Sequence, residues 1–352
     1  MSRKRILVIA HDAGGANILA SIVAKYRGSF SWHLAVAGPA ARIFSDHALL
    51  NQDDCVGVTE DTTDQIIDRC LPDMVLTGTG WQTRIELAAV LCARRRGIAV
   101  ASYLDHWTHY RERFGNPNDW LENLPDFVLV GDGYAQELAC LDGFPYARLV
   151  GIENPYLEVF LKGFDCRGEA NKVGPKRVLF LSEPVQVAFA GQDAPARSWA
   201  GAEFHVVSEL AHLVAGPLAG QVDLSIRLHP SEPEAKYDGE RALLAAAKAD
   251  VHSAFAVPLQ TDLERADIAI GIGSMALLAA VAARVKAIAW IPSGIESALP
   301  HPQIRRCRSA GEVLSELRAP AVPSAPADLR LCTVPFDRAA GDIIASHART
   351  QV

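Results

Sequence analysis

The stretch RILVIA at Arg5–Ala10, followed by HDAGG at residues 11–15 and ANILASIVAK at residues 16–25, decides the fold. The apolar run predicts a buried strand, the paired glycines predict a tight turn, and the second apolar segment predicts a helix. The same order recurs along the first half, with strands expected at residues 33–37, 74–77, 98–104 and 127–130 and helices at 63–69, 83–95 and 134–141. Strands that alternate with helices at this spacing predict βαβ units and a parallel sheet covered on both faces.

The character of the sequence changes at residues 162–176, KGFDCRGEANKVGPK, which are polar and rich in glycine. Such a stretch indicates a linker, and RVLFL at residues 177–181 then restarts the strand pattern. Further strands are expected at residues 224–228, 269–271 and 287–291, and further helices at 206–214, 239–248, 262–266 and 274–283. We therefore expect an α/β protein of two Rossmann-like domains, residues 1–165 and 176–335, with an amphipathic helix at 336–352 that could pack on either domain.

The composition excludes several classes of function. The chain has 352 residues with 34 Lys+Arg against 41 Asp+Glu, so no basic surplus supports a dedicated nucleic-acid-binding face. The seven cysteines are scattered without a CxxC pair, which argues against a zinc site and favours reduced thiols in a cytoplasmic protein. The longest uncharged run, residues 268–283, is sixteen residues and too short to span a membrane. No cofactor or metal is expected, and peripheral membrane association and oligomeric state stay open.

Polar and glycine residues follow the strands of the first half. In open parallel sheets ligands bind at the carboxyl ends of strands, so His11, Asp12, Gly14 and Gly15 are candidates for binding an acceptor or for catalysis. The alternative is a tight strand–helix turn in which His11 and Asp12 act only as helix caps. After the strand at 74–77, the candidates for acceptor binding are Thr79 and Trp81.

The decapeptide at residues 105–114, DHWTHYRERF, follows another expected strand. It combines two carboxylates, two histidines, three aromatic residues and two arginines, a density that is unusual for a solvated loop. We interpret it as an acceptor-binding or catalytic loop, with an ordinary surface loop as the alternative. Its candidate residues are Asp105, His106, Trp107, Tyr110, Arg111 and Arg113.

The second half carries residues suited to an activated phosphate. Arg227 and His229 alternate with Leu228, so we expect them to point to one side and to form a cation pair for a phosphate leaving group. A plain turn before Pro230 is the alternative. The backbone and hydroxyl at Gly273 and Ser274, which open an alanine-rich helix, predict an anion site, although a ligand-free crossover has the same pattern. The pair Ser182 and Glu183, which follows the first strand of this half, is also a candidate for donor binding.

The ordered set RLHP at 227–230, VPL at 257–259, ADIAIG at 266–271 and GS at 273–274 resembles the donor half of GT-B glycosyltransferases. More narrowly, it is similar to bacterial transferases with an HP motif and a later Ser motif: CMP-sugar sialyl- and Kdo-type transferases and CDP-glycerol polymerases. The resemblance implies two Rossmann-like domains that face each other across a cleft. It also implies donor-phosphate contacts from His229, Pro230 and Ser274, and contacts to the base from the backbone of Val257, Pro258 and Leu259. The sequence departs from the double Ser/Thr of these families, because Met275 follows Ser274.

The function expected from this pattern is metal-independent glycosyl transfer in polysaccharide biosynthesis. The donor would be a nucleotide-activated sugar, with a CMP-linked acidic sugar favoured, and the acceptor a glycan or a lipid-linked glycan. His229 would stabilise the leaving group, Asp12 would be the general base, and Asp105 would orient the acceptor. The alternatives are a nucleotide-sugar hydrolase of the same fold, in which His11 would activate water, a UDP-sugar 2-epimerase of the same fold, and a non-catalytic nucleotide-binding protein.

Overall fold

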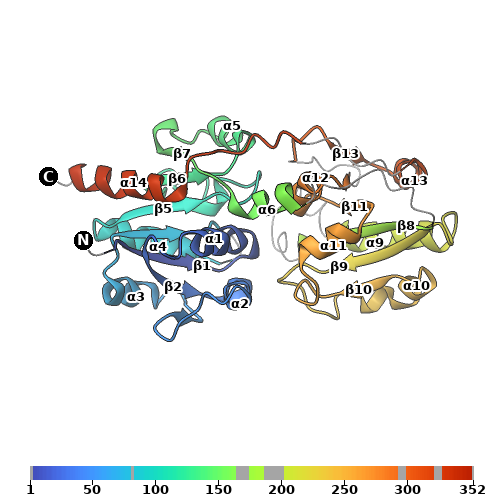
Figure 1. The fold of residues 1–352 in the computed structure, drawn as a ribbon, viewed down its shortest axis with the longest axis horizontal. Coiled ribbons are helices and arrows are strands. Elements are labelled where there is room, and N and C mark those ends of the chain that lie inside the picture. The colour runs from blue at the N-terminus through green and yellow to red at the C-terminus, as the bar shows by residue number, and fades with distance from the viewer. Residues whose placement is uncertain are drawn as a thin grey trace. The chain divides into compact units, whose positions relative to one another are not determined.

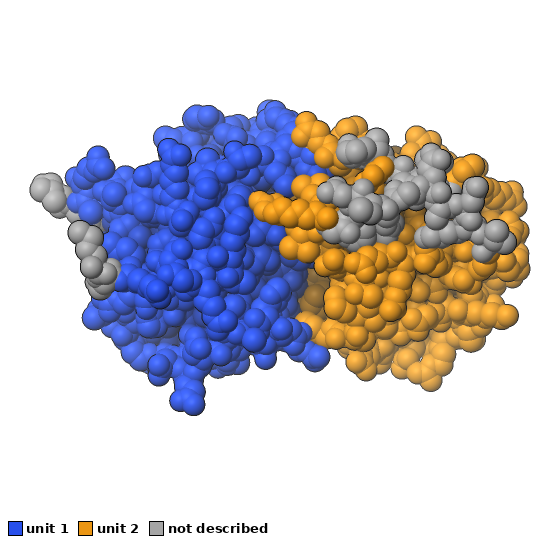
Figure 2. Space-filling model, in the orientation of Figure 1, with its two compact units in different colours: residues 1–156, 329–352 blue, residues 157–328 orange. Residues whose placement is uncertain are grey.

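A computed structural model describes residues 3–80, 83–163, 174–185, 202–291, 299–320 and 327–350. The chain divides into two compact units, coloured separately in Figure 2: unit 1 is Met1–Tyr156 with Leu329–Val352, and unit 2 is Leu157–Asp328. The sequence placed the divisions at residues 165–176 and 335 instead. Of the expected linker, residues 164–173 lie outside the described part of the chain.

Unit 1 is built on a parallel sheet. The described residues form seven strands in the order β3-β2-β1-β4-β5-β6-β7, and every neighbouring pair is parallel. Strands β1, β2, β5, β6 and β7 are labelled in Figure 1. The central strands β1, β4 and β5 are buried except at Arg5, which explains their largely apolar sequences. The strands are β1 Arg5–Ala10, β2 Ser31–Val36, β3 Cys55–Val56, β4 Met74–Thr77, β5 Ala99–Tyr103, β6 Phe127–Val130 and β7 Leu149–Gly151.

Helices join the strands of unit 1 and cover the sheet. On one face, Leu7 of β1 and Val75 of β4 belong to the same apolar core as Ile67 and Val90 of two neighbouring helices, α3 and α4. The helical segments are α1 Ala13–Lys25, α2 Gly38–Asp46, α3 Thr63–Cys70, α4 Ile85–Arg95, η1 Glu112–Phe114, α5 Gly133–Leu141, η2 Tyr146–Arg148, α6 Pro155–Gly163 and α14 Phe336–Thr350, of which α6 crosses the division between the units.

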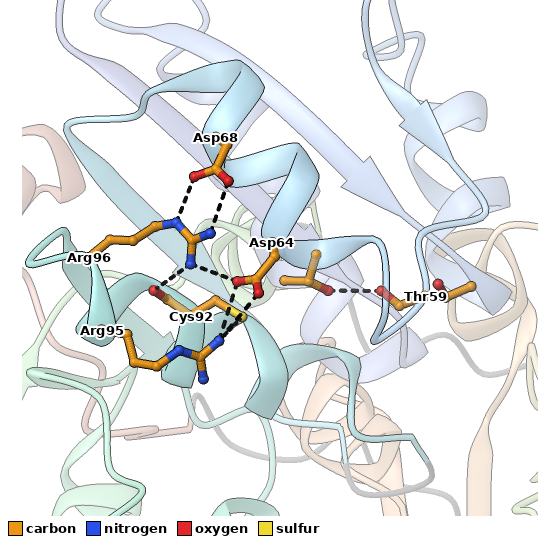
Figure 3. Close-up of polar contacts among 7 residues, drawn as sticks. Thr59, Asp64, Asp68, Cys92, Arg95 and Arg96 are labelled. Atoms are coloured by element: carbon orange, nitrogen blue, oxygen red, sulfur yellow. Dashed lines mark hydrogen bonds and ion pairs between the residues drawn. The ribbon is translucent and has the colours of Figure 1, made fainter.

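An ion-pair network joins α3 to the end of α4 at the surface (Figure 3). Arg96 binds both carboxylate oxygens of Asp68, at 2.7 and 3.0 Å, and its Nη1 lies 2.6 Å from an oxygen of Asp64. Arg95 also reaches Asp64, at 3.3 Å. Because both aspartates are exposed, the network fastens two surface helices and carries no sign of a ligand site.

The last described segment returns to unit 1. Residues 330–334 hydrogen-bond to the loops after β6 and β7 through pairs such as Cys332 N–H to Gly131 O at 2.9 Å and Glu153 N–H to Val334 O at 3.0 Å. Phe336 of α14 is fully buried and stacks 6.0 Å from Trp32 of β2. These contacts explain why the division falls before Leu329 and not at residue 335.

Unit 2 repeats the architecture. Its described residues form six strands in the order β10-β9-β8-β11-β12-β13, with all neighbours parallel. The strands are β8 Lys176–Leu181, β9 Val222–Arg227, β10 Asp250–His252, β11 Ile268–Gly271, β12 Lys286–Trp290 and β13 Ile304–Cys307. The helical segments are α9 Ala202–Ala215, η3 Asp238–Glu240, α10 Arg241–Ala246, α11 Leu259–Arg265, α12 Ala276–Ala282 and α13 Ala310–Arg318.

The predicted α/β class with two parallel Rossmann-like sheets is confirmed. The sequence analysis missed the edge strands β3, β7, β10 and β13 and the helices α6 and α13. Among the described residues, no helix is long and apolar enough to cross a membrane.

Candidate active site

Each sheet has one position where the chain order reverses. In unit 1 the chain continues from β1 to β2 on one side and from β4 to β5 on the other side, so the connections leave the β1–β4 boundary in opposite directions. Ligands of open α/β sheets bind at such switch points. Here the loops are in close contact, because a Cβ on Gly15 would lie 3.2 Å from the Cα of Gly78. Glycine at position 15 therefore lets the two loops meet.

His11 and Asp12 form a side-chain pair at this switch point. His11 Nδ1 lies 2.7 Å from Asp12 Oδ1, and this hydrogen bond raises the pKa of His11 even though partial burial acts in the opposite direction. Asp12 occupies the position before α1 but makes no capping hydrogen bond with its side chain. The interpretation of these residues as helix caps is therefore wrong for Asp12, whose carboxylate bonds the His11 ring.

Glu86 is a residue of this site that the sequence analysis missed. It is the second residue of α4 and only 3% exposed, and its Oε1 accepts the backbone N–H of His11 at 2.8 Å. Burial, with the charge of Asp12 as a second cause, raises the pKa of Glu86 to about 7. The signal was present in the sequence, because Glu86 shares a helix face with the buried residues Ala89, Val90 and Ala93. A carboxylate on an apolar stripe indicates a special environment.

Asp105 reaches the same turn from the end of β5. Its Oδ1 accepts from Arg113 Nη1 at 2.7 Å and from Thr79 Oγ1 at 3.2 Å. Both members of the Asp105–Arg113 pair are largely buried, with side chains 11% and 6% exposed. A Cβ on Gly14 would lie 1.9 Å from Asp105 Oδ2. The structure therefore brings together His11, Asp12, Gly14, Gly15, Thr79, Asp105 and Arg113 within unit 1.

The other residues of the 105–114 loop have structural contacts. Trp107 and Tyr110 are buried, so neither ring is exposed to contact an acceptor, contrary to their expected role in acceptor binding. Trp107 Nε1 donates to Asp132 at 3.2 Å, and the ring of Tyr110 packs against Phe144. The reason is that the loop folds back over α5, which turns its aromatic residues into core.

Three further candidates for acceptor binding complete this region. Arg111 donates to the carbonyl of Asp142 at 2.7 Å and lies over the ring of Trp120, so it tethers the loop. His106 Nδ1 accepts the N–H of Trp107 at 2.9 Å. Trp81 lies outside the described residues.

In unit 2, Arg227 does not form the expected cation pair with His229. Its guanidinium binds Asp262 at 2.7 Å and also donates to the carbonyls of Ala254 and Val257. Arg227 therefore holds the loop before α11, where Pro258 is the residue preceding the helix and Leu259 its first residue. The guanidinium of Arg227 binds within this loop because Asp262 provides a buried carboxylate as its partner.

His229 and Pro230 form the turn that follows β9. The backbone N–H of His229 donates to Glu232 Oε2 at 2.8 Å, and His229 Nδ1 lies 2.8 Å from Ser231 Oγ. The buried Lys236 binds Glu232 and donates to the carbonyl of Glu183 at 2.8 Å. The HP turn is therefore fastened to the end of β8.

The predicted anion site at Gly273 and Ser274 already holds a carboxylate. Glu183 Oε1 accepts the backbone N–H groups of Ile272 and Gly273 at 2.8 and 2.9 Å. Ser274 Oγ accepts the N–H of Ala276 at 3.2 Å. The expectation of a free phosphate cradle here is therefore wrong, because Glu183 folds into the switch point of unit 2. Burial raises the pKa of Glu183 to about 7.

Ser182 is buried, and its hydroxyl lies 2.7 Å from Tyr237 OH. Within the part of the chain that the structure describes, no group of three or more His, Cys, Asp or Glu side chains is arranged to hold a metal ion.

Three solved structures share the fold of the chain over nearly its whole length. The S. aureus MnaA–UDP co-structure has a TM-score of 0.71 at 11% identity, covering 98% of this chain and 97% of that one. The Methanocaldococcus jannaschii UDP-GlcNAc 2-epimerase in complex with UDP-GlcNAc and UDP has 0.66 at 12% identity, covering 97% and 99%. The Neisseria meningitidis UDP-GlcNAc 2-epimerase bound to UDP-GlcNAc has 0.62 at 10% identity, covering 99% of both. No family model and no curated protein sequence matches. The chain therefore has a GT-B-type fold like that of these proteins.

Proposed function

We propose that the chain is a nucleotide-sugar enzyme of the UDP-sugar 2-epimerase type, with hydrolysis of the nucleotide sugar as the alternative reaction. The observation that carries this proposal is the acid–base group set at the switch point of unit 1. His11 and Asp12 of the β1–α1 turn and Glu86 of α4 are joined by hydrogen bonds or by charge. The full-length likeness to UDP-GlcNAc 2-epimerases supports the same choice.

Inversion at a sugar carbon requires a proton to leave that carbon and a proton to return to it. A group that accepts and then releases a proton near neutral pH suits this task. The His11–Asp12 pair suits this task, because an imidazole titrates near neutral pH and the hydrogen bond to Asp12 raises the pKa of His11 above its ordinary value. We assign proton transfer to His11 and Asp12. Asp105, whose Oδ1 is held by Arg113 and Thr79, is assigned to orient the sugar.

We assign nucleotide binding to unit 2, at the carboxyl ends of β8, β9 and β11. His229 and the hydroxyl of Ser274 are the proposed contacts to the diphosphate, and the loop at 257–259 is the proposed contact to the base. Arg227 acts by holding that loop through Val257 O and Asp262. The carboxylate of Glu183 excludes phosphate from the N–H groups of Ile272 and Gly273.

The test begins with ligand binding. A thermal-shift series with UDP, CMP, CDP, GDP and TDP identifies the base, because a ligand that binds the folded state raises its apparent stability. We expect UDP to give the largest shift. A shift with CMP alone would support the CMP-sugar transferases instead.

The second step is incubation with UDP-GlcNAc in D2O, followed by NMR. An epimerase gives a C2-inverted nucleotide sugar that carries deuterium at C2, and a hydrolase gives UDP and free sugar. The HP turn at His229 and Pro230 favours glycosyl transfer as the second candidate, and that activity would require an added acceptor. Asp12→Asn should lose the reaction, whereas Asp46→Asn, at the exposed end of α2, should keep it.

A further inference from the structure

The carboxyl groups of Glu86 and Asp12 both lie next to the backbone of Gly80. A Cβ on Gly80 would lie 2.8 Å from Asp12 Oδ2 and 3.1 Å from Glu86 Oε2. The two oxygens therefore lie on one side of Gly80, and the absence of a side chain there gives them room. Asp12 comes from the β1–α1 turn and Glu86 from the first turn of α4.

The two oxygens of Glu86 have different surroundings. Oε1 accepts the His11 N–H at 2.8 Å. Oε2 is buried and has no hydrogen-bond partner among the described residues. A buried carboxylate oxygen without a donor is costly. A proton on Oε2 lowers that cost, because it removes the buried charge and lets the neutral acid act as a donor toward the carboxylate of Asp12.

We propose that Glu86 and Asp12 share one proton carried on Glu86 Oε2, and that Glu86 is thereby a positioning residue that sets the protonation of the Asp12–His11 pair. Two carboxyl groups placed this closely do not readily ionise together. The burial that raises the pKa of Glu86 to about 7 supports this assignment. Glu86 itself stays beneath the turn, since it is 3% exposed, and acts through its two neighbours.

Charged groups from the β1–α1 turn and from the loop after β5 surround the Glu86–Asp12 pair. The His11 ring contacts Asp12 on the side of the β1–α1 turn. Asp105 and Arg113 approach the same turn through Gly14 and Thr79, and they form an ion pair with each other. Arg113 therefore directs its charge at Asp105. The proton on Glu86 is what relieves the repulsion from Asp12.

The experiment is an NMR titration of the full chain without substrate, using protein labelled with 13C at the glutamate and aspartate carboxyls. In the wild type we expect the Glu86 carboxyl to titrate near pH 7, well above the usual 4.3 or so for glutamate. In Asp12→Asn its midpoint should fall by about one pH unit or more, because the neighbouring charge is gone.

The ring of His11 provides a second signal. In Glu86→Gln the pKa of His11 should fall, because Glu86 loses its proton near pH 7 in the wild type and its negative charge then raises the pKa of His11. Glu153→Gln is the matched control, since Glu153 is also a buried glutamate of unit 1 but binds Lys25 and Tyr26. It should leave the His11 titration unchanged.

Two results would overturn the proposal. An ordinary glutamate midpoint for Glu86 means that no proton is held, and a raised midpoint that Asp12→Asn does not move means that burial alone holds it. If Glu86→Gln fails to fold, the wild type and Asp12→Asn still decide between these outcomes.

The catalytic consequence rests on the proposed function. It predicts that Glu86→Gln lowers kcat more than it raises KM and removes the pH dependence near 7. The titrations need no turnover, so they test the shared proton even if UDP-GlcNAc is not the substrate.

Discussion

Replacement of Arg113 by methionine should destabilise unit 1 strongly. The guanidinium lies 2.7 Å from Asp105 and 3.1 Å from Thr79 Oγ1, and its side chain is 6% exposed. In Arg113→Met the buried carboxylate of Asp105 keeps the Thr79 hydroxyl as a hydrogen-bond partner but loses its cation. Removal of one partner from a buried ion pair costs about 3–5 kcal/mol. We expect a loss of that size in the free energy of unfolding.

Native-state hydrogen exchange measures this loss at the amides of Val75 and Val100, which lie in fully buried strands of unit 1. The double variant Asp105→Asn/Arg113→Met should lose less than the sum of the single variants, because no buried charge is left unpaired. Arg96→Met is the control, since its ion pairs are with exposed aspartates, and it should lose much less. A loss below about 1 kcal/mol in Arg113→Met, or strict additivity in the double variant, would refute the reasoning.

Three further predictions concern other parts of the molecule. Asp12→Asn should lower kcat about 10²- to 10⁴-fold at saturating substrate, the usual contribution of general acid–base catalysis, as measured by product formation. Glu183 has a folded-state pKa of about 7, above its unfolded value near 4.5. The stability that its protonated form contributes below pH 4.5 should therefore be lost as the pH rises through 7. The denaturation midpoints measured at about pH 5 and about pH 8 should differ less in Glu183→Gln than in the wild type. Phe336→Ala should cost about 3–5 kcal/mol and make α14 sensitive to proteolysis, because the ring is fully buried.

Much of the fold could be predicted from sequence because parallel strands buried on both faces appear as continuous apolar runs. RILVIA and RVLFL are such runs, and both became central strands. The edge strands β3 and β10 are two and three residues long and only partly buried, so they leave no comparable run. The segment at 330–334 pairs through its backbone, which requires no particular side chains.

The candidate site could be predicted as a location but not as a set of partners. The residues after β1, β4 and β5 were expected at the sheet edge, and they do meet there. The partners of Arg227 and Glu183 lie 35 and 89 residues away in the chain, and local spacing carries no information about such distances. Both side chains instead satisfy buried groups of their own unit. The burial of Trp107 likewise depends on α5, where Tyr134 packs against its ring.

The division of unit 1 into Met1–Tyr156 and Leu329–Val352 has a consequence for biosynthesis. A ribosome makes unit 2 in full before the segment that carries Phe336. Until that segment emerges, the aromatic side chains of Tyr26, Phe30 and Trp32 lack the ring that covers them. Unit 1 therefore stays incompletely packed while unit 2 is translated. Exposed apolar surface of this kind is what chaperones recognise.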